Sequence, residues 1–189
     1  MFKVTLFSVL LSFSLLFQAC SDNSKSQEAQ DANSMLSSNE FILTALDKKQ
    51  IVVKKTPSGV QVEGMDGKVV IFDIFATWCP PCQQGATHLT SLQEKYKDDL
   101  VIIGVTIEEG IDNAKLTAFQ SQYNAHYTLV NSTQNRRFVN YIASSLKLGA
   151  RFPIPIVAMY KDGKLINHYI GAIEEEFIQS DIKKALEKH

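Results

Sequence analysis

The motif Trp-Cys-Pro-Pro-Cys at residues 78–82 constrains this chain most, because it stands between two segments of different periodicity. Residues 69–76 are apolar apart from Asp73, a pattern typical of a strand buried on both faces. After the motif, apolar residues recur at helical spacing, at Ala86, Leu89 and Leu92. The sequence therefore predicts a buried strand that leads directly into a helix, with two cysteines where the helix starts.

The two cysteines of this motif predict thiol–disulfide exchange. A C-x-x-C pair at such a junction puts the sulfur of Cys79 at the helix N-terminus. Unpaired N–H groups and the helix dipole favour the thiolate there, and the thiolate is the form that attacks disulfides. Cys82 follows closely enough to close a disulfide ring and release a bound partner. We therefore expect Cys79 to be the nucleophile and Cys82 the resolving cysteine.

A structural disulfide and a metal site are the alternatives for this pair. A bridge across so short a loop constrains little of the unfolded chain. Zinc and iron–sulfur sites usually need four ligands. The third cysteine, Cys20, lies in the N-terminal segment, and the four histidines show no ligand spacing. We therefore expect no metal, and no cofactor other than the redox-active Cys79–Cys82 disulfide.

Residues 1–19 have the pattern of a secretory signal peptide. Lys3 supplies the positive charge, and residues 4–17 are an apolar stretch of 14 residues interrupted only by Thr and Ser. As a helix this stretch would span about 21 Å, too short for a hydrocarbon core of about 30 Å. The residues that end in Ala19 and Cys20 resemble a bacterial lipoprotein signal, which implies that Cys20 carries lipid. The alternative is an ordinary signal or an uncleaved anchor; either puts the domain outside the cytoplasm.

Composition divides the rest of the chain into a tether and one domain. Residues 20–39 are rich in Ser, Asn, Gln and Asp, so they predict a flexible tether behind the lipidated cysteine. Residues 40–189 are long enough to form one domain with a substantial core. The formal net charge is −1, and no basic stripe is present, which argues against a nucleic-acid partner. We expect a monomer that meets the membrane through its lipid.

The apolar and turn patterns of the domain predict an α/β fold, in which a central mixed sheet has helices on both faces. Short strands come first, at 41–46, 51–53 and 60–62, followed by a strand at 69–76 and a helix at 83–98. The remaining predicted elements are strands at 100–107, 127–130, 156–160 and 165–170, and helices at 112–123, 136–148 and 174–188, with Gly149 ending the second of these helices.

From about residue 41 to residue 188 this pattern resembles the thioredoxin superfamily. Within it, the chain is similar to the membrane-tethered extracytoplasmic thiol–disulfide oxidoreductases of the TlpA/ResA type. Residues 75–82 match their site closely, and the helix and strand at 112–130 are an insertion that plain thioredoxins lack. The resemblance implies a thioredoxin-like fold with an N-terminal β extension. It also implies an enzyme that reduces client disulfides, possible clients including apocytochrome c, and receives electrons from a membrane thiol donor of the DsbD/CcdA kind.

Other functions remain open for the same site. A disulfide-forming oxidase or an isomerase would use the same two cysteines, whereas a non-catalytic adaptor would not need both thiols. Pro81 has no N–H to offer the Cys79 sulfur, so the thiolate should be stabilised only moderately, which favours a reductant or an isomerase.

The resemblance also assigns residues around the cysteines. Thioredoxins carry a cis-proline eight residues before the glycine of the last hairpin turn, here Gly163, so the expected cis bond is Ile154–Pro155. The backbone of Ile154 is then expected to bind an extended substrate segment. Gly171 matches a family glycine beside this groove. The alternatives are two prolines that merely end a sheet edge, and a simple strand-ending turn at Gly171.

Three further residue types complete the predicted site. Trp78, with Pro80 and Pro81, is expected to contact substrate, and its ring is expected to pack over the sulfurs. Asp73 lies six residues before Cys79, where thioredoxins carry a buried acid. With no basic residue nearby, burial should raise the pKa of this carboxyl, which suits a base for Cys82. The alternative is a purely structural Asp.

Overall fold

A computed structural model describes residues 39–187 of the chain. The predicted signal peptide, Cys20 and nearly all of the predicted tether lie outside these residues. Within the described part, no helix is both long enough and apolar enough to cross a membrane.

A five-stranded mixed sheet forms the centre of the domain, in the order β6-β5-β4-β7-β8. Its strands are β4 (Val69–Phe75), β5 (Leu100–Thr106), β6 (Thr128–Val130), β7 (Ile156–Lys161) and β8 (Lys164–Ile170). The middle strand, β4, pairs in parallel with β5 and antiparallel with β7. All seven of its residues are buried, because the strand has neighbours at both edges and on both faces.

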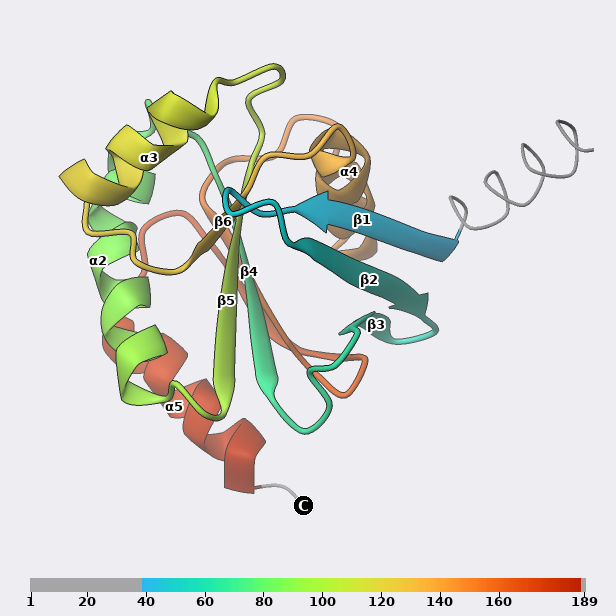
Figure 1. Ribbon diagram of the computed structural model, residues 1–189. Coiled ribbons are helices and arrows are strands. Elements are labelled where there is room, and N and C mark those ends of the chain that lie inside the picture. The colour runs from blue at the N-terminus through green and yellow to red at the C-terminus, as the bar shows by residue number, and fades with distance from the viewer. Residues whose placement is uncertain (1–38, 188–189) are drawn as a thin grey trace, which may run out of the picture. The chain divides into compact units, whose positions relative to one another are not determined.

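Helices cover both faces of this sheet, as the sequence predicted (Figure 1). Helices α2 (Pro80–Lys95), α3 (Asn113–Gln122) and α5 (Glu175–Glu187) contribute to one apolar cluster, and α4 (Asn135–Ser145) contributes to the other. Along β4, Ile71 and Phe75 belong to the α2 side, whereas Phe72 and Ile74 belong to the α4 side. Because strand side chains alternate, Asp73 points to the α2 side, where the two cysteines also lie.

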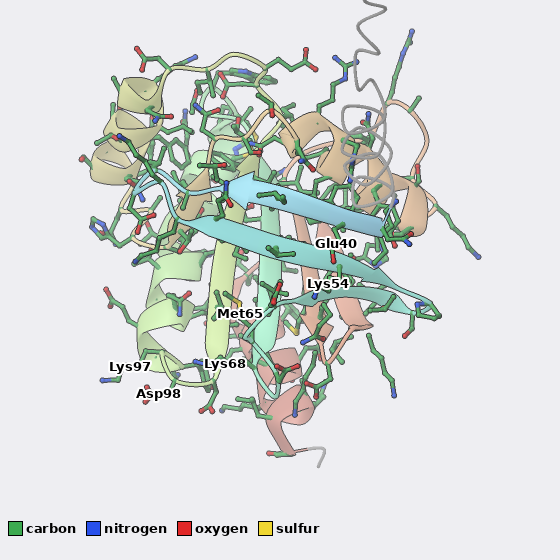
Figure 2. All side chains as sticks on the ribbon, turned by 45° about the vertical axis from the view of Figure 1, so that its right-hand side comes forward. Glu40, Lys54, Met65, Lys68, Lys97 and Asp98 are labelled. Carbon is green, nitrogen blue, oxygen red and sulfur yellow. A yellow bond between two sulfur atoms is a disulfide. The ribbon has the colours of Figure 1, made fainter. Side chains whose placement is uncertain are left out.

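The N-terminal β extension is a separate antiparallel sheet of β1 (Glu40–Thr44), β2 (Gln50–Thr56) and β3 (Gly59–Val62). It packs on the α4 side, where the rings of Phe41 and Phe138 meet edge to face with centroids 5.1 Å apart. Glu40 and Lys54 lie on neighbouring strands of this sheet and form an ion pair of 3.8 Å (Figure 2). Such a partly exposed pair contributes little to stability.

Three predicted helix boundaries were wrong by three residues, among them the end of α2, which lies at Lys95 and not at residue 98. Helix α2 begins at Pro80 and not at residue 83, because proline suits the first turn of a helix, where its missing N–H costs nothing. Helix α4 ends at Ser145 and not at residue 148. Lys147 adopts a left-handed φ of 58°, and its N–H bonds the Ser144 carbonyl, so the helix closes before Gly149 is reached.

Candidate redox site

The N-terminus of α2 holds the first cysteine in place. Cys79 is the N-cap residue, and its Sγ accepts a hydrogen bond from the N–H of Cys82, with 3.4 Å between nitrogen and sulfur. An N-cap side chain normally accepts from the second or third helical residue. Here Pro80 and Pro81 occupy the first two positions and have no N–H. Of the two amides that usually serve an N-cap, therefore, only that of Cys82 is available to the sulfur.

Cys79 and Cys82 are joined as a disulfide, with their Cα atoms 5.2 Å apart. Both residues are buried, each with 3% of its surface exposed. Trp78, which we expect to pack over the sulfurs, is 61% exposed. Its ring is therefore available for contact with a partner beside a nearly covered disulfide.

The predicted substrate groove brings three more residues to Cys79. The Ile154–Pro155 bond is cis, as predicted. The carbonyl oxygen of Ile154 lies 3.9 Å from Cys79 Sγ, and the carbonyl of Pro155 accepts a hydrogen bond of 2.8 Å from the N–H of Gly171. Gly171 has a φ of 81°, which favours glycine, and a Cβ there would enter open space. Ile154, Pro155 and Gly171 thus come together beside the disulfide.

A cavity of about 80 Å³ connects the surroundings of Cys82 with Asp73. Its other lining residues include Gly85, His88, Pro155, Gly171 and Glu174. His88 Nδ1 is buried and has no hydrogen-bond partner among the described residues. The cavity is large enough for water, because one molecule needs only about 10–15 Å³ of such space.

Burial raises the pKa of Asp73 to about 7, although a hydrogen bond from Tyr127 acts to lower it. The carboxyl is 3% exposed, and Tyr127 Oη donates to its Oδ2 at 2.8 Å. The direction of the shift agrees with the sequence prediction. The sequence analysis did not predict the partner of this carboxyl, a neutral hydroxyl supplied by the residue before β6.

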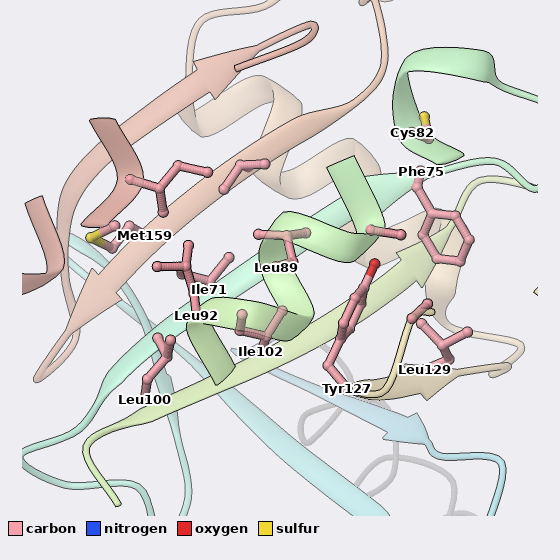
Figure 3. Packing of buried hydrophobic residues seen from close by; sticks show 14 of the residues in the cluster. Ile71, Phe75, Cys82, Leu89, Leu92, Leu100, Ile102, Tyr127, Leu129 and Met159 are labelled. Atoms are coloured by element: carbon pink, nitrogen blue, oxygen red, sulfur yellow. The ribbon is translucent and has the colours of Figure 1, made fainter. Parts of the chain in front are cut away.

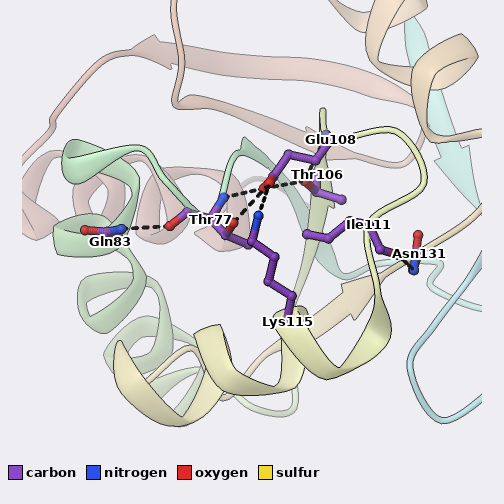
Figure 4. A network of polar contacts seen from close by, with 7 residues as sticks. All are labelled: Thr77, Gln83, Thr106, Glu108, Ile111, Lys115 and Asn131. Carbon is purple, nitrogen blue, oxygen red and sulfur yellow. Dashed lines mark hydrogen bonds and ion pairs between the residues drawn. The ribbon is translucent and has the colours of Figure 1, made fainter.

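A second group that the sequence analysis missed holds the loop before Trp78 (Figure 4). Glu108 accepts hydrogen bonds from the Thr77 N–H at 2.6 Å and from the Thr77 hydroxyl at 3.1 Å. On the other side, Gln83 Nε2 donates to the Thr77 carbonyl at 2.7 Å. Lys115, on α3, pairs with Glu108 at 2.9 Å. Burial acts to raise the pKa of Glu108, but bonds from Thr77 and Lys115 hold it below its ordinary value.

The sequence did contain a signal for this contact. Thr77 follows β4 and Glu108 follows β5, and these two strands are parallel neighbours. The carboxyl ends of parallel strands meet at one edge of a sheet, so polar residues directly after them lie close together.

Comparison with known proteins identifies the family. Residues 25–186 match the sequence profile of the Redoxin family. The chain belongs to the Redoxin family. A similar relative of this redoxin is the thiol-disulfide oxidoreductase ResA of Bacillus thuringiensis, 24% identical over 188 residues, which cover 97% of this chain and 95% of the relative.

Solved structures confirm the thioredoxin-like fold. A thiol:disulfide interchange protein of the thioredoxin family from Chlorobium tepidum aligns with a TM-score of 0.59 and 18% identity, covering 78% of this chain and 94% of that one. StoA from Bacillus subtilis aligns with a TM-score of 0.54 and 16% identity, covering 75% and 95%. Family membership and the buried Cys79–Cys82 pair at a helix N-terminus together make this redoxin a thiol–disulfide oxidoreductase. Within residues 39–187, no group of three potential ligands could hold a metal ion.

The first prediction concerns Asp73. Well below pH 3.8 this carboxyl is neutral whether the chain is folded or unfolded. Between its ordinary value of 3.8 and the folded value of about 7, the unfolded chain releases the proton that the folded state keeps, so the free energy of unfolding falls as pH rises. The full loss is on the order of 4 kcal/mol. Asp73→Asn should abolish this decline in melting experiments. It should also slow the attack of Cys82 on a mixed disulfide between Cys79 and a partner, on the order of 10²-fold.

Two outcomes would contradict this role. Identical pH profiles of disulfide reduction for the wild type and Asp73→Asn would reduce Asp73 to a structural residue. A large loss of stability in Asp73→Asn would show that the carboxylate holds β4 in place.

The second prediction concerns Pro81, whose position usually offers an N–H to the N-cap side chain. Pro81→Ala should restore that donor, stabilise the Cys79 thiolate and make the protein more oxidising. A hydrogen bond to a charged group contributes roughly 1.5–3 kcal/mol, equivalent to a rise of roughly 30–60 mV in reduction potential. Equilibration with glutathione measures the change. Pro80→Ala is the matched control, because an N–H at the first position does not reach the cap; an equal rise in both variants would refute the explanation.

Proposed function

We propose that this oxidoreductase reduces disulfides of client proteins outside the cytoplasm. One observation supports reduction rather than oxidation of clients. Of the two amides that usually serve an N-cap, only that of Cys82 is available to the Cys79 sulfur. Fewer donors stabilise the thiolate less, and a less stable reduced form gives up its electrons more readily. The dithiol is itself the redox group, so we expect no further cofactor.

The reaction needs two exchanges. The Cys79 thiolate attacks the client disulfide, forms a mixed disulfide, and one client sulfur leaves as a thiolate. Cys82 then passes its proton to Asp73 and attacks Cys79 Sγ, so the Cys79–Cys82 bond forms and the second client sulfur leaves. Two electrons reach the client, and its two sulfurs take up protons to become thiols.

We assign client binding to the surface around Cys79. The Ile154 carbonyl, 3.9 Å from Cys79 Sγ, lies where an extended client segment would pass. The exposed residues Trp78 and Pro80 and the half-buried Pro81 would contact that segment, and Gly171 leaves space beside it. A C-x-x-C loop such as that of apocytochrome c is one client that fits this description. Re-reduction requires an upstream membrane thiol donor of the DsbD/CcdA kind.

We further propose that the domain is exported and tethered by lipid on Cys20. This proposal rests on the sequence alone: the signal-like residues 1–19, the following cysteine and the polar tether up to residue 39. Two or three acyl chains, at about 0.8 kcal/mol per buried methylene, would hold the protein firmly on a bacterial membrane.

The third prediction tests the direction of exchange in cells. Cys82→Ser should accumulate mixed disulfides between Cys79 and clients, because attack proceeds and release does not. These adducts appear as reductant-sensitive bands of higher mass, which Cys79→Ser should lack. If Cys79→Ser were the better trap, the roles of the two cysteines would be reversed. In wild-type cells the pair should be mostly reduced; a mostly oxidised pair would favour an oxidase, and an absence of exchange would favour an adaptor.

The fourth prediction tests the tether. Cys20→Ala should move the protein from the membrane to the soluble extracytoplasmic fraction, because the acyl chains are lost. Fractionation of cells and metabolic labelling with a fatty acid measure both effects. Unchanged retention without label would mean that residues 4–17 act as an uncleaved anchor.

A further inference from the structure

The hydrogen bond between Tyr127 and Asp73 is a buried contact inside the redox domain. Tyr127 and Asp73 are 4% and 3% exposed, and the distance between Oη and Oδ2 is 2.8 Å. Tyr127 lies in the apolar cluster that also contains Phe75, Cys82 and Leu129 (Figure 3). A buried hydroxyl without a hydrogen-bond partner would destabilise the folded domain. Asp73 is the partner of the Tyr127 hydroxyl.

Gly104 makes room for the tyrosine ring. It lies on β5 directly opposite Asp73 in the parallel register. A Cβ on Gly104 would lie 3.0 Å from Tyr127 Cε2 and 2.5 Å from Leu129 Cδ2, closer than side chains pack. Strand β5 therefore carries no side chain opposite Asp73. The ring of Tyr127, from the segment between α3 and β6, occupies that space.

Apart from Tyr127, no group near Asp73 in the described part of the chain donates a hydrogen bond to its carboxyl. The residues opposite Asp73 on the neighbouring strands are Gly104 on β5 and Val157 on β7, and neither ionises. Around the cavity the titratable groups are Cys82 and His88 from α2 and Glu174 before α5. Among residues 39–187, Tyr127 is the one hydrogen-bond donor to the Asp73 carboxyl.

We propose that Tyr127 is a positioning residue for proton transfer: its hydroxyl holds Oδ2 of Asp73, so that Oδ1 takes the proton of Cys82. This inference deepens the proposed function and rests on it. As the Cys82 sulfur attacks Cys79 Sγ, its proton passes to Asp73 Oδ1 and the client sulfur leaves with the electron pair of the broken bond.

The hydrogen bond also keeps the carboxyl able to act as a base. A donor stabilises the ionised carboxylate more than the neutral acid, so Tyr127 opposes the rise in pKa that burial imposes on Asp73. Burial and the neighbouring Asp73 in turn raise the pKa of Tyr127 well above its ordinary value. The phenol therefore remains protonated, and remains a donor, throughout the pH range in which Asp73 titrates.

The test is Tyr127→Phe in the full-length chain, a change that keeps the ring and removes the hydroxyl. Carboxyl NMR of the reduced protein, assigned by the signal lost in Asp73→Asn, should show the Asp73 titration moving upward on the order of one pH unit. Resolution is followed by thionitrobenzoate release from a mixed disulfide on Cys79. At a pH below both midpoints its rate should fall on the order of tenfold, with the pH profile displaced in the same direction. Tyr127→3-fluorotyrosine, a stronger donor, should move the titration downward.

Tyr96→Phe is the matched control, because the Tyr96 hydroxyl is buried without a partner among the described residues. It should leave the Asp73 titration unmoved. In an Asp73→Asn background, Tyr127→Phe should cause no further slowing. An unshifted titration in Tyr127→Phe, or equal slowing with and without Asp73, would overturn the proposal. Failure of the proposed function is seen separately, since a protein that reduces no client in cells would still report the Asp73 titration.

Discussion

Complete burial of β4 is the constraint on which the redox site depends. The strand is paired at both edges, with β5 and β7, and is covered on both faces by apolar clusters. The position of its carboxyl end is therefore fixed. Asp73 lies within the strand, and Thr77 and Cys79 follow it directly. The bonds from Glu108 and Gln83 to Thr77 then continue this rigidity beyond the last strand residue. Cys79, at the N-terminus of α2, therefore meets Ile154, which lies in the loop just before β7.

The chemistry at Cys79 reflects two opposing effects at one helix end. The N-terminus of α2 favours a thiolate through its dipole and through the Cys82 amide. The two prolines permit the helix to start immediately after the cysteine, but they remove the other amide that an N-cap could use. The same residues that fix the geometry thus limit thiolate stabilisation, which keeps the pair a better electron donor than an N-terminus with both amides would be.

Local patterns predicted most of the fold and the centre of the site. The strand, the helix and both cysteines at their junction could be predicted because the residues involved are adjacent in sequence. The end of α4 was missed because Lys147, a residue with no glycine-like signal, takes the left-handed conformation. Tyr127 could not be predicted, since it lies 54 residues from Asp73 and its contact depends on the space that Gly104 leaves. The resemblance to thioredoxins supplied Pro155, whereas Asp73 also stands out in the sequence as the one charged residue of an apolar strand.

Asp73 shows why an otherwise apolar strand retains a carboxyl. Fully desolvated, the group would stay neutral across the pH range in which thiols exchange, and a neutral acid accepts no proton. Salt-bridged to a lysine, it would stay ionised and hold a proton too weakly. A neutral hydroxyl gives an intermediate result: the pKa of Asp73 is raised by burial, opposed by Tyr127, and comes to about 7. The stability lost by keeping this carboxyl buried is therefore tied to a group that can both take and return a proton near neutral pH.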